Sequence, residues 1–415
     1  MKNSWYKNNK LLIVALLLTV IFSSCNKNND PVPDQPQFTY LQSDEQSSTI
    51  TQAPTQFVFS ALGTQYDDAK GLSAYIQTDA TVYKITYNTT FQDSALTVSG
   101  LVCVPNNAGK YPVLCFQNGT NVEYSKAPTE DSGNQLFQVL ESVSTMGFVV
   151  VIPDYPGFGA SKQVLHPYLE KDNTVPCLVD ILKATREFVS QDKVAAGLND
   201  DLYIMGYSQG GWATMQLQSE IEQNGLAGYN LKASSCGAGP YNLNYLNFMF
   251  ASADTYPMPY FIAYLMDAYS THGQFTNPLS DVFAEPYASE IPALFNGTNT
   301  GEEINAQLTT NIADLLQPAF RTGFQANPDY QSIQTAFKNN SVKAWNLSTP
   351  TRLYHGDADP VVPIEMSQNL YKDFTDLGVS GDKIQLVTMP GVSHTSGILP
   401  FGLASLKWFL ELENK

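Results

Sequence analysis

The fold of this chain is decided by the motif Gly206-Tyr207-Ser208-Gln209-Gly210. The four residues before it, Leu-Tyr-Ile-Met, are apolar and predict a buried strand, and residues 211–217 predict a helix. In a strand-turn-helix setting, the small residues on either side of the serine allow a turn so tight that the serine hydroxyl projects from the carboxyl end of a sheet. The amino terminus of the helix would face a developing oxyanion. Ser208 is therefore the first candidate for a nucleophile.

A serine is a poor nucleophile at neutral pH, so Ser208 needs a general base and an acid that orients the base. In the fold that the motif predicts, these residues follow in the order serine, acid, histidine. The chain has four histidines, and one of them, His394, lies downstream of the loop that would carry the acid. We therefore expect His394 to be the general base. His355, at the end of a predicted strand, is interpreted as structural.

Two aspartates compete for the role of the acid, because Asp357 and Asp359 both follow the predicted strand at residues 351–354. Residues 356–363 resemble the Gly-x-x-Asp-x-x-Val-Pro loop that carries the acid in α/β-hydrolases, and Asp359 occupies the acid position in that register. We assign the acid to Asp359 and expect Asp357 to cap the turn by accepting hydrogen bonds from backbone amides. Asp357 remains the alternative.

From about Tyr83 to its carboxyl terminus, the chain resembles the α/β-hydrolase superfamily, and within it the secretory lipase and esterase group. The closer match lies in the segments FQNGT at 116–120, PDYPGFGAS at 153–161 and HPYL at 166–169. The resemblance implies that backbone amides bind the oxyanion, one from Gln209 and one from Thr120 or Gly119. The group usually has His-Gly-Thr where this chain has Asn-Gly-Thr at 118–120. His166 belongs to a loop motif and is expected to be packed rather than catalytic.

The order of the predicted strands indicates an α/β fold. Eight strands are expected, at residues 81–89, 95–104, 113–116, 148–152, 202–205, 231–236, 351–354 and 384–388. The first two alternate like an antiparallel pair, and the others are near-continuous apolar runs of the kind buried in a parallel sheet with helices on both faces. The resemblance makes this an α/β-hydrolase fold with an eight-stranded, mostly parallel sheet.

Residues 240–345 interrupt the alternation of strands and helices, since they contain no strong strand and many aromatic residues. They predict a helical cap inserted between strands six and seven, over the carboxyl edge of the sheet where ligands bind in such folds. The hydrolase core is then expected at 53–239 and 346–415. The cap could move as a lid or stay fixed, and its prolines favour a fixed cap and soluble short-to-medium acyl esters.

The amino terminus predicts export. Three lysines precede an apolar stretch at 11–22 that is too short to span a bilayer of about 30 Å but suits a signal peptide. The sequence Phe-Ser-Ser-Cys at 22–25 resembles a bacterial lipobox, so we expect 1–25 to be a lipoprotein signal peptide and Cys25 to be lipidated; ordinary cleavage is the alternative. Residues 26–52, rich in Asn, Pro, Gln and Ser, are expected to form a flexible tether. These features predict a cell-envelope lipoprotein on the outer membrane, facing the periplasm or the cell surface.

The other cysteines and the charge exclude several classes of protein. Cys103 and Cys115 are expected to be buried thiols, with a bridge between Cys177 and Cys236 as an alternative, and no Cys and His cluster has the spacing of a metal site. The formal charge is −17, and loss of the signal peptide removes three lysines and no acid. Such a field repels phosphate backbones and no basic patch is visible, so nucleic acid is excluded as a partner.

The sequence therefore predicts a serine hydrolase that cleaves carboxylic esters through an acyl-enzyme. Ser208, Asp359 and His394 would form the catalytic triad, and neither a metal nor a cofactor is expected. The partners are a small-molecule or lipid ester and a membrane reached through Cys25. A serine peptidase of the same fold is one alternative, because ester and amide cleavage share this machinery. An inactive lipoprotein that binds glycans or lipids is the other, and the complete triad argues against it.

Overall fold

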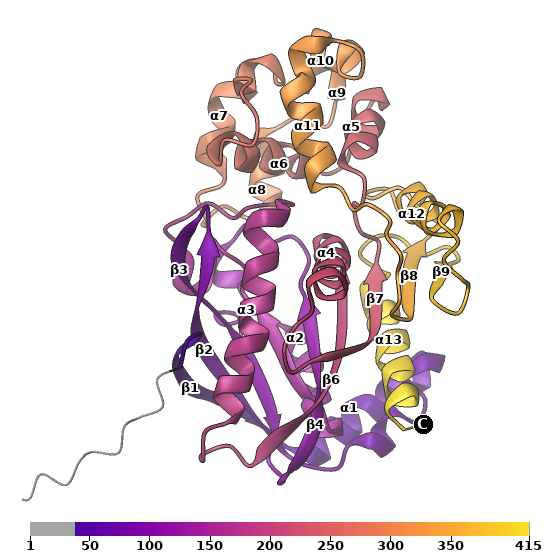
Figure 1. Cartoon of the computed structure of the whole chain (residues 1–415). Coiled ribbons are helices and arrows are strands. Elements are labelled where there is room, and N and C mark those ends of the chain that lie inside the picture. The colour runs from indigo at the N-terminus through magenta and orange to yellow at the C-terminus, as the bar shows by residue number, and fades with distance from the viewer. Residues whose placement is uncertain (1–37, 415) are drawn as a thin grey trace, which may run out of the picture. The chain divides into compact units, whose positions relative to one another are not determined.

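The computed structural model describes residues 38–414, and Figure 1 shows how their helices and strands are arranged. The expected signal peptide, Cys25 and residues 26–37 of the expected tether lie outside the described residues. Within the described part, no helix is both long enough and apolar enough to cross a membrane.

A nine-stranded sheet runs through the described part in the order β1-β2-β3-β5-β4-β6-β7-β8-β9. Its strands are β1 Leu41–Ile50, β2 Ala80–Phe91, β3 Ser94–Pro105, β4 Gly109–Gln117, β5 Val149–Pro153, β6 Ala196–Tyr207, β7 Asn230–Gly237, β8 Thr351–Gly356 and β9 Ile384–Met389. The pairs from β1 to β5 along this order are antiparallel, and the pairs from β5 to β9 are parallel. The predicted mixed, mostly parallel sheet is confirmed.

The expected number of eight strands is wrong, because Leu41–Ile50 forms a ninth strand. The expectation of a tether over 26–52 is therefore also wrong for this segment. β1 pairs antiparallel with β2, and Leu41 is its one buried residue. The backbone amides of Thr39, Tyr40 and Leu41 also donate hydrogen bonds to the carboxylate of Glu187. Polar composition shows that a segment cannot bury much surface, but an edge strand is ordered by ladder hydrogen bonds as well as by burial.

The two faces of the sheet carry separate apolar layers. On β5, Val149 and Val151 belong to one buried cluster, whereas Val150 and Ile152 belong to the other. Successive side chains of a strand point to opposite faces, so a strand covered on both sides reads as a continuous apolar run. One face is covered by α3 Lys171–Val189, α4 Gln209–Asn224 and α12 Glu365–Asp376, and the other by α1 Gln52–Gln65, α2 Gln135–Ser142 and α13 Ile398–Glu413.

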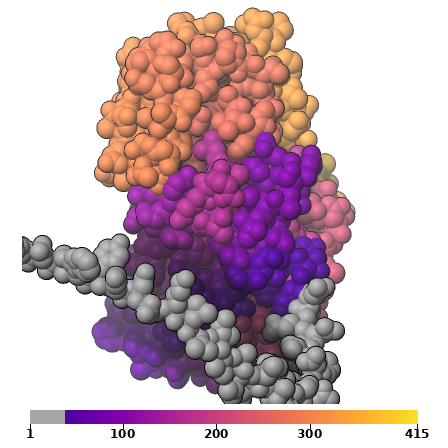
Figure 2. All heavy atoms as spheres, turned by 90° about the vertical axis from the view of Figure 1, so that its left-hand side faces the viewer, coloured from indigo at the N-terminus to yellow at the C-terminus, as the bar shows by residue number. Residues whose placement is uncertain are grey.

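The chain between β7 and β8 forms a set of short helices, called the cap below. Its α-helices are α5 Leu243–Ser252, α6 Tyr260–Thr271, α7 Tyr287–Leu294, α8 Gly301–Gln307, α9 Ile312–Leu315, α10 Pro318–Gly323 and α11 Gln331–Asn340. They gather beyond one end of the strands in Figure 1. On the face shown in Figure 2, the atoms of the cap lie directly against the core. Most of the cap's large apolar side chains are buried and continue the apolar layer that α3 and α4 form.

The four cysteines of the described part are free and buried. Cys103 pairs with Val150 and Cys115 with Val151, so β5 lies between the two thiols. The alternative of a bridge between Cys177 and Cys236 is not formed. The Cys177 sulfur lies 3.0 Å from the hydroxyl of Tyr87 instead. Burial raises the pKa of the Cys177 and Cys236 thiols to about 12, so both stay protonated and unreactive.

Candidate active site

Ser208 occupies the sharp turn between β6 and α4. Its backbone has φ 59° and ψ −122°, a conformation that a non-glycine residue adopts at a cost of about 1–3 kcal/mol. Glycines make the turn possible, because a Cβ atom at Gly206 would overlap the Gly210 carbonyl oxygen and one at Gly210 would overlap that of Gln117. The sequence Gly-x-Ser-x-Gly is thus required by the close approach of three backbone segments, and it presents the Ser208 side chain at the carboxyl end of β6.

His394 and Asp359 reach Ser208 from the loops that follow β9 and β8. The imidazole Nε2 of His394 lies 2.9 Å from Ser208 Oγ, and its Nδ1 lies 2.6 Å from Asp359 Oδ2. β6, β7, β8 and β9 are parallel neighbours, so their carboxyl ends meet at one edge of the sheet. Three residues that are 35 to 186 positions apart are therefore brought into one line of hydrogen bonds.

Asp359 is held in place by more than His394. Its side chain is fully buried, and its Oδ1 accepts hydrogen bonds from the backbone amides of Val361 and Val362 at 2.8 and 2.9 Å. Burial alone would raise the pKa of this carboxyl group. The nearby ring N–H of His355, the hydrogen bond from His394 and the backbone amide of Val362 outweigh the burial and hold the pKa of Asp359 well below its usual range. Asp359 is therefore ionised at neutral pH.

Asp357 has a different surrounding from Asp359. It is exposed, and its Oδ1 accepts a hydrogen bond from the amide of Gly391 at 2.6 Å, across the two loops that carry Asp359 and His394. Of the two aspartates that the sequence left as alternatives, Asp359 is the one that contacts His394.

The residues expected to bind an oxyanion lie around Ser208. A Cβ atom at Gly119 would lie 3.9 Å from that of Ser208, so the turn after β4 runs beside the candidate nucleophile. Two buried tyrosines fix this turn: Tyr155 donates to the Asn118 carbonyl oxygen at 3.1 Å, and the Tyr168 hydroxyl lies 2.9 Å from Thr120 Oγ1. Among the described residues, the backbone amides of Gly119, Thr120 and Gln209 find no hydrogen-bond acceptor. All three are therefore free for a ligand, and the choice between Thr120 and Gly119 stays open.

Sequence reasoning missed a contact between Gln209 and His166. The side-chain nitrogen of Gln209 lies 2.6 Å from His166 Nε2, and His166 Nδ1 lies 2.8 Å from the Pro156 carbonyl oxygen. A carbonyl can only accept, so Nδ1 carries the ring hydrogen and Nε2 accepts from the amide of Gln209. Burial lowers the pKa of His166 to about 4, which keeps the ring neutral at neutral pH. The sequence contained one signal for this contact: Gln209, directly after the candidate nucleophile, is a long polar side chain at the start of a helix that is buried.

A small apolar cavity, called the acyl cavity below, adjoins Ser208. It has a volume of about 20 Å³ and is lined by Tyr168, Leu169, Ser208, Pro240, Leu246, Phe250, Tyr256, Phe261, Leu265, Val361 and Val362. None of these side chains is charged. A space of this size holds about one water molecule.

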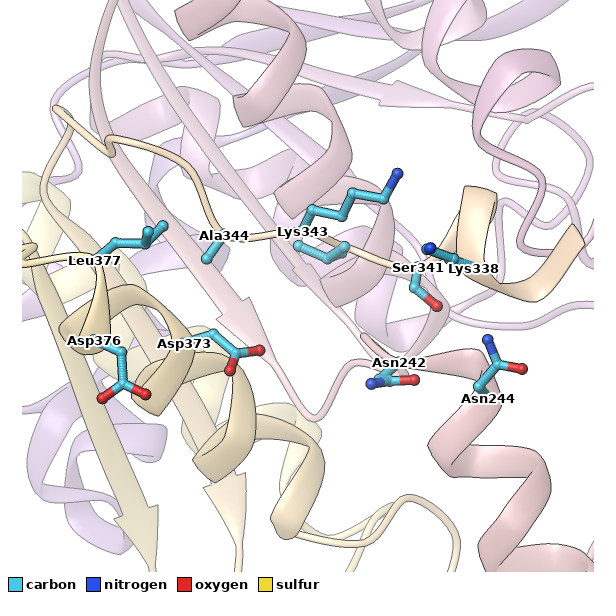
Figure 3. Close-up of a pocket in the computed structure, with 10 residues that line it drawn as sticks. Asn242, Asn244, Lys338, Ser341, Lys343, Ala344, Asp373, Asp376 and Leu377 are labelled. Carbon is cyan, nitrogen blue, oxygen red and sulfur yellow. The ribbon is translucent and has the colours of Figure 1, made fainter. Parts of the chain in front are cut away.

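Larger hollows lie elsewhere on the described part and include none of Ser208, Asp359 and His394. One of about 900 Å³ lies between α1, α2 and the start of α13. Another of about 560 Å³ is shown in Figure 3, with Asp373 and Asp376 of α12 on one side and Asn242 and Asn244 at the start of α5 on the other. Volume alone therefore does not locate the chemistry. Within residues 38–414, no group of three or more His, Cys, Asp or Glu side chains is placed to hold a metal ion.

Comparison with known proteins agrees with this architecture. Residues 135–402 match the model of the Alpha/beta hydrolase family. The chain belongs to this family. The predicted fold is thereby confirmed, apart from the ninth strand. No curated protein sequence matches the chain.

Three solved structures extend the likeness over nearly all of the chain. A candidate hydrolase from Legionella pneumophila is 22% identical with a TM-score of 0.78, over 91% of this chain and 99% of that one. The rice cell wall degrading esterase LipA from Xanthomonas oryzae is 22% identical with a TM-score of 0.75, over 92% and 98%. Candida antarctica lipase A in its closed state is 16% identical with a TM-score of 0.64, over 92% and 86%. At these identities the likeness shows a shared fold, so the chain resembles this esterase and this lipase in fold.

Proposed function

We propose that this protein is a serine hydrolase that cleaves carboxylic esters. The observation that carries the proposal is the line of hydrogen bonds from Asp359 through His394 to Ser208, at 2.6 and 2.9 Å. Asp359 is an ionised acceptor, so Nδ1 of His394 carries the ring hydrogen and Nε2 is free to accept the proton of Ser208. This is the tautomer that a general base requires.

The proposed reaction proceeds in two halves. Ser208 Oγ attacks the ester carbonyl while His394 Nε2 takes its proton, and Asp359 stabilises the imidazolium that forms. The backbone amide of Gln209 and that of Thr120 or Gly119 would donate to the oxyanion. Collapse of the intermediate expels the alcohol, which takes the proton from His394, and leaves an acyl-serine. Water then repeats these steps and releases the acid.

The lining of the acyl cavity favours an ester over a peptide. A peptidase that recognises a chain terminus needs a carboxylate or a cation to bind it, and the cavity beside Ser208 contains neither. An apolar wall suits the acyl part of an ester. A function limited to binding would leave unexplained the complete line of hydrogen bonds from Asp359 through His394 to Ser208, because binding alone does not need all three side chains in this order.

The proposal is tested by Ser208→Ala, with Ser132→Ala as a matched control because Ser132 is exposed and its hydroxyl makes no hydrogen bond within the described residues. Wild type and Ser132→Ala should react with a fluorophosphonate probe and hydrolyse p-nitrophenyl acetate. Ser208→Ala should lose the labelling and a factor on the order of 10³ to 10⁶ in kcat, with an unchanged melting temperature. Turnover close to wild type in Ser208→Ala would end the proposal.

We also propose that the protein is an exported lipoprotein, anchored to the outer membrane through Cys25. The support is the short apolar stretch at 11–22 and the lipobox-like Phe-Ser-Ser-Cys at 22–25. Cells fed an alkyne-tagged fatty acid should label the wild-type protein and retain it in the outer-membrane fraction. Cys25→Ser should be unlabelled and should leave that fraction. A wild-type protein that is soluble and unlabelled would contradict the anchor.

A further inference from the structure

We propose that the acyl site accepts a two-carbon acyl group, which makes acetyl esters the substrate class, and that Leu246, Phe250 and Tyr256 of the cap set this limit. The inference rests on the proposed ester hydrolysis and adds the size of the acyl group to it. It concerns the acyl side of the ester and leaves the alcohol open.

The first argument is the size of the acyl cavity beside Ser208. Its volume of about 20 Å³ has room for about one water molecule, which is also about the size of the methyl group of an acetyl ester. A butyryl chain adds two methylene groups, and the side chains that line the cavity would have to move to make room for them. Extra methylenes in a packed site force side chains off their rotamers or shift the backbone, and both changes are unfavourable.

The second argument is that the walls of the cavity are tightly held. The rings of Phe250 and Tyr256 lie 4.4 Å apart between centroids, and both side chains are buried. The hydroxyl of Tyr256 donates to the Val361 carbonyl oxygen at 3.1 Å, which joins the cap to the loop that carries Asp359. On the core side, Tyr168 stacks on Tyr264 of α6 at 4.9 Å. A longer acyl chain would have to break these contacts to enter.

The third argument is that the cap is fastened to the core at several separate places. At the end of α6, His272 Nδ1 lies 2.6 Å from a buried Glu170 carboxylate oxygen. At the end of α11, the Asn340 carbonyl oxygen accepts from the indole of Trp212 at 2.8 Å. The Gly297 carbonyl oxygen, between α7 and α8, accepts from the amide of Tyr124 at 2.8 Å.

These fastenings bear on whether the cap can open for a longer substrate. Breaking a buried hydrogen bond without replacement leaves unsatisfied polar groups, which is unfavourable for each one. Swinging the whole cap aside would break all of these hydrogen bonds together with the buried aromatic contacts beneath the cap. The acyl cavity that the closed structure contains is therefore the one that the substrate meets.

The test compares kcat/KM for p-nitrophenyl acetate, butyrate and hexanoate, each below its solubility limit. In the wild type, kcat/KM should fall at least about tenfold from acetate to butyrate, since one extra methylene group in a hydrophobic pocket already changes specificity by about 10–200-fold. Phe250→Ala should raise the butyrate-to-acetate ratio at least about tenfold. Phe248→Ala is the matched control: it is the same substitution on the same helix, but Phe248 is 41% exposed and does not line the cavity. Its ratio should equal that of the wild type.

Phe250→Ala could fail to fold, so Leu246→Ala serves as a second enlarging variant. Fluorophosphonate labelling and the melting temperature report whether each variant retains its fold and its nucleophile. The size limit is overturned if the wild type hydrolyses hexanoate as fast as acetate. It is equally overturned if both enlarged variants are labelled by the probe and keep the wild-type ratio. A wild type that hydrolyses none of the three esters and resists the probe would instead overturn the proposed function itself.

Discussion

Replacing Asp359 by asparagine removes one charge and keeps the size of the side chain. The carboxylate accepts two backbone hydrogen bonds on Oδ1 and contacts His394 on Oδ2. Asparagine has one oxygen and one NH₂ group, so it cannot serve both sides. With its oxygen toward Val361 and Val362, its NH₂ faces Nδ1 of His394 and moves the ring hydrogen to Nε2. His394 then cannot accept the proton of Ser208.

The opposite orientation of the amide has its own penalty. It keeps the hydrogen bond to His394, but its NH₂ then faces the amides of Val361 and Val362, and each unsatisfied donor costs about 1–3 kcal/mol. We therefore expect Asp359→Asn to lose a factor of about 10² to 10⁴ in kcat, equivalent to about 2.7–5.4 kcal/mol of transition-state stabilisation.

The assay is kcat and KM for p-nitrophenyl acetate, with a thermal melt of each variant. Asp357→Asn is the matched control, because its remaining side-chain oxygen can still accept from the amide of Gly391. We expect it to stay within about threefold of wild-type activity, as is usual for exposed sites. If Asp357→Asn loses as much activity as Asp359→Asn, or if Asp359→Asn turns over nearly as fast as the wild type, the assignment of the acid is refuted.

Two further predictions follow from the buried carboxyl groups and the cap. Burial raises the pKa of Glu141 in the folded protein to about 7. In the unfolded chain the pKa of this carboxyl group is about 4.5, so the folded state is favoured by its neutral form below pH 4.5 and loses this stabilisation as the pH rises through 7. Glu141→Gln should therefore match the wild type at pH 4 and be more stable than the wild type at pH 8.5, by about 1 kcal/mol after allowance for solvent. The same difference in melting temperature between variant and wild type at both pH values would contradict this. The fastened cap predicts ordinary saturation with triacetin and no jump in rate beyond its solubility limit, whereas sharp activation at the interface would make the cap a mobile lid.

The strands of the parallel sheet could be predicted from the sequence because each is buried on both faces. In β5, alternate residues enter opposite apolar layers, so the whole run had to be apolar. β1 carries no such signal. Most of its side chains are exposed, and its order depends on pairing with β2, which the composition of residues 41–50 does not encode.

The candidate site could be predicted to a similar degree. The turn at Ser208 is a local requirement of backbone geometry, and the order of the acid and histidine loops follows from the fold, so three distant residues could be named together. The contact between Gln209 and His166 joins segments 43 positions apart, and the acyl cavity is enclosed by side chains from the cap and the core. Such contacts depend on how packed elements meet, which neither periodicity nor motif spacing describes.

The surroundings of Asp359 explain why His394, and not the nearby His355, is the histidine that we propose as the base. His355 Nε2 lies 3.4 Å from Asp359 Oδ2, but it also lies 2.8 Å from the Val362 carbonyl oxygen, which must be the acceptor of its ring hydrogen. His355 Nδ1 then accepts from the hydroxyl of Ser367 at 2.7 Å. Both nitrogens of His355 are thus satisfied by neutral groups. Its N–H dipole helps to keep Asp359 ionised, while the short charge-assisted hydrogen bond of the carboxylate goes to His394, the histidine whose other nitrogen contacts Ser208.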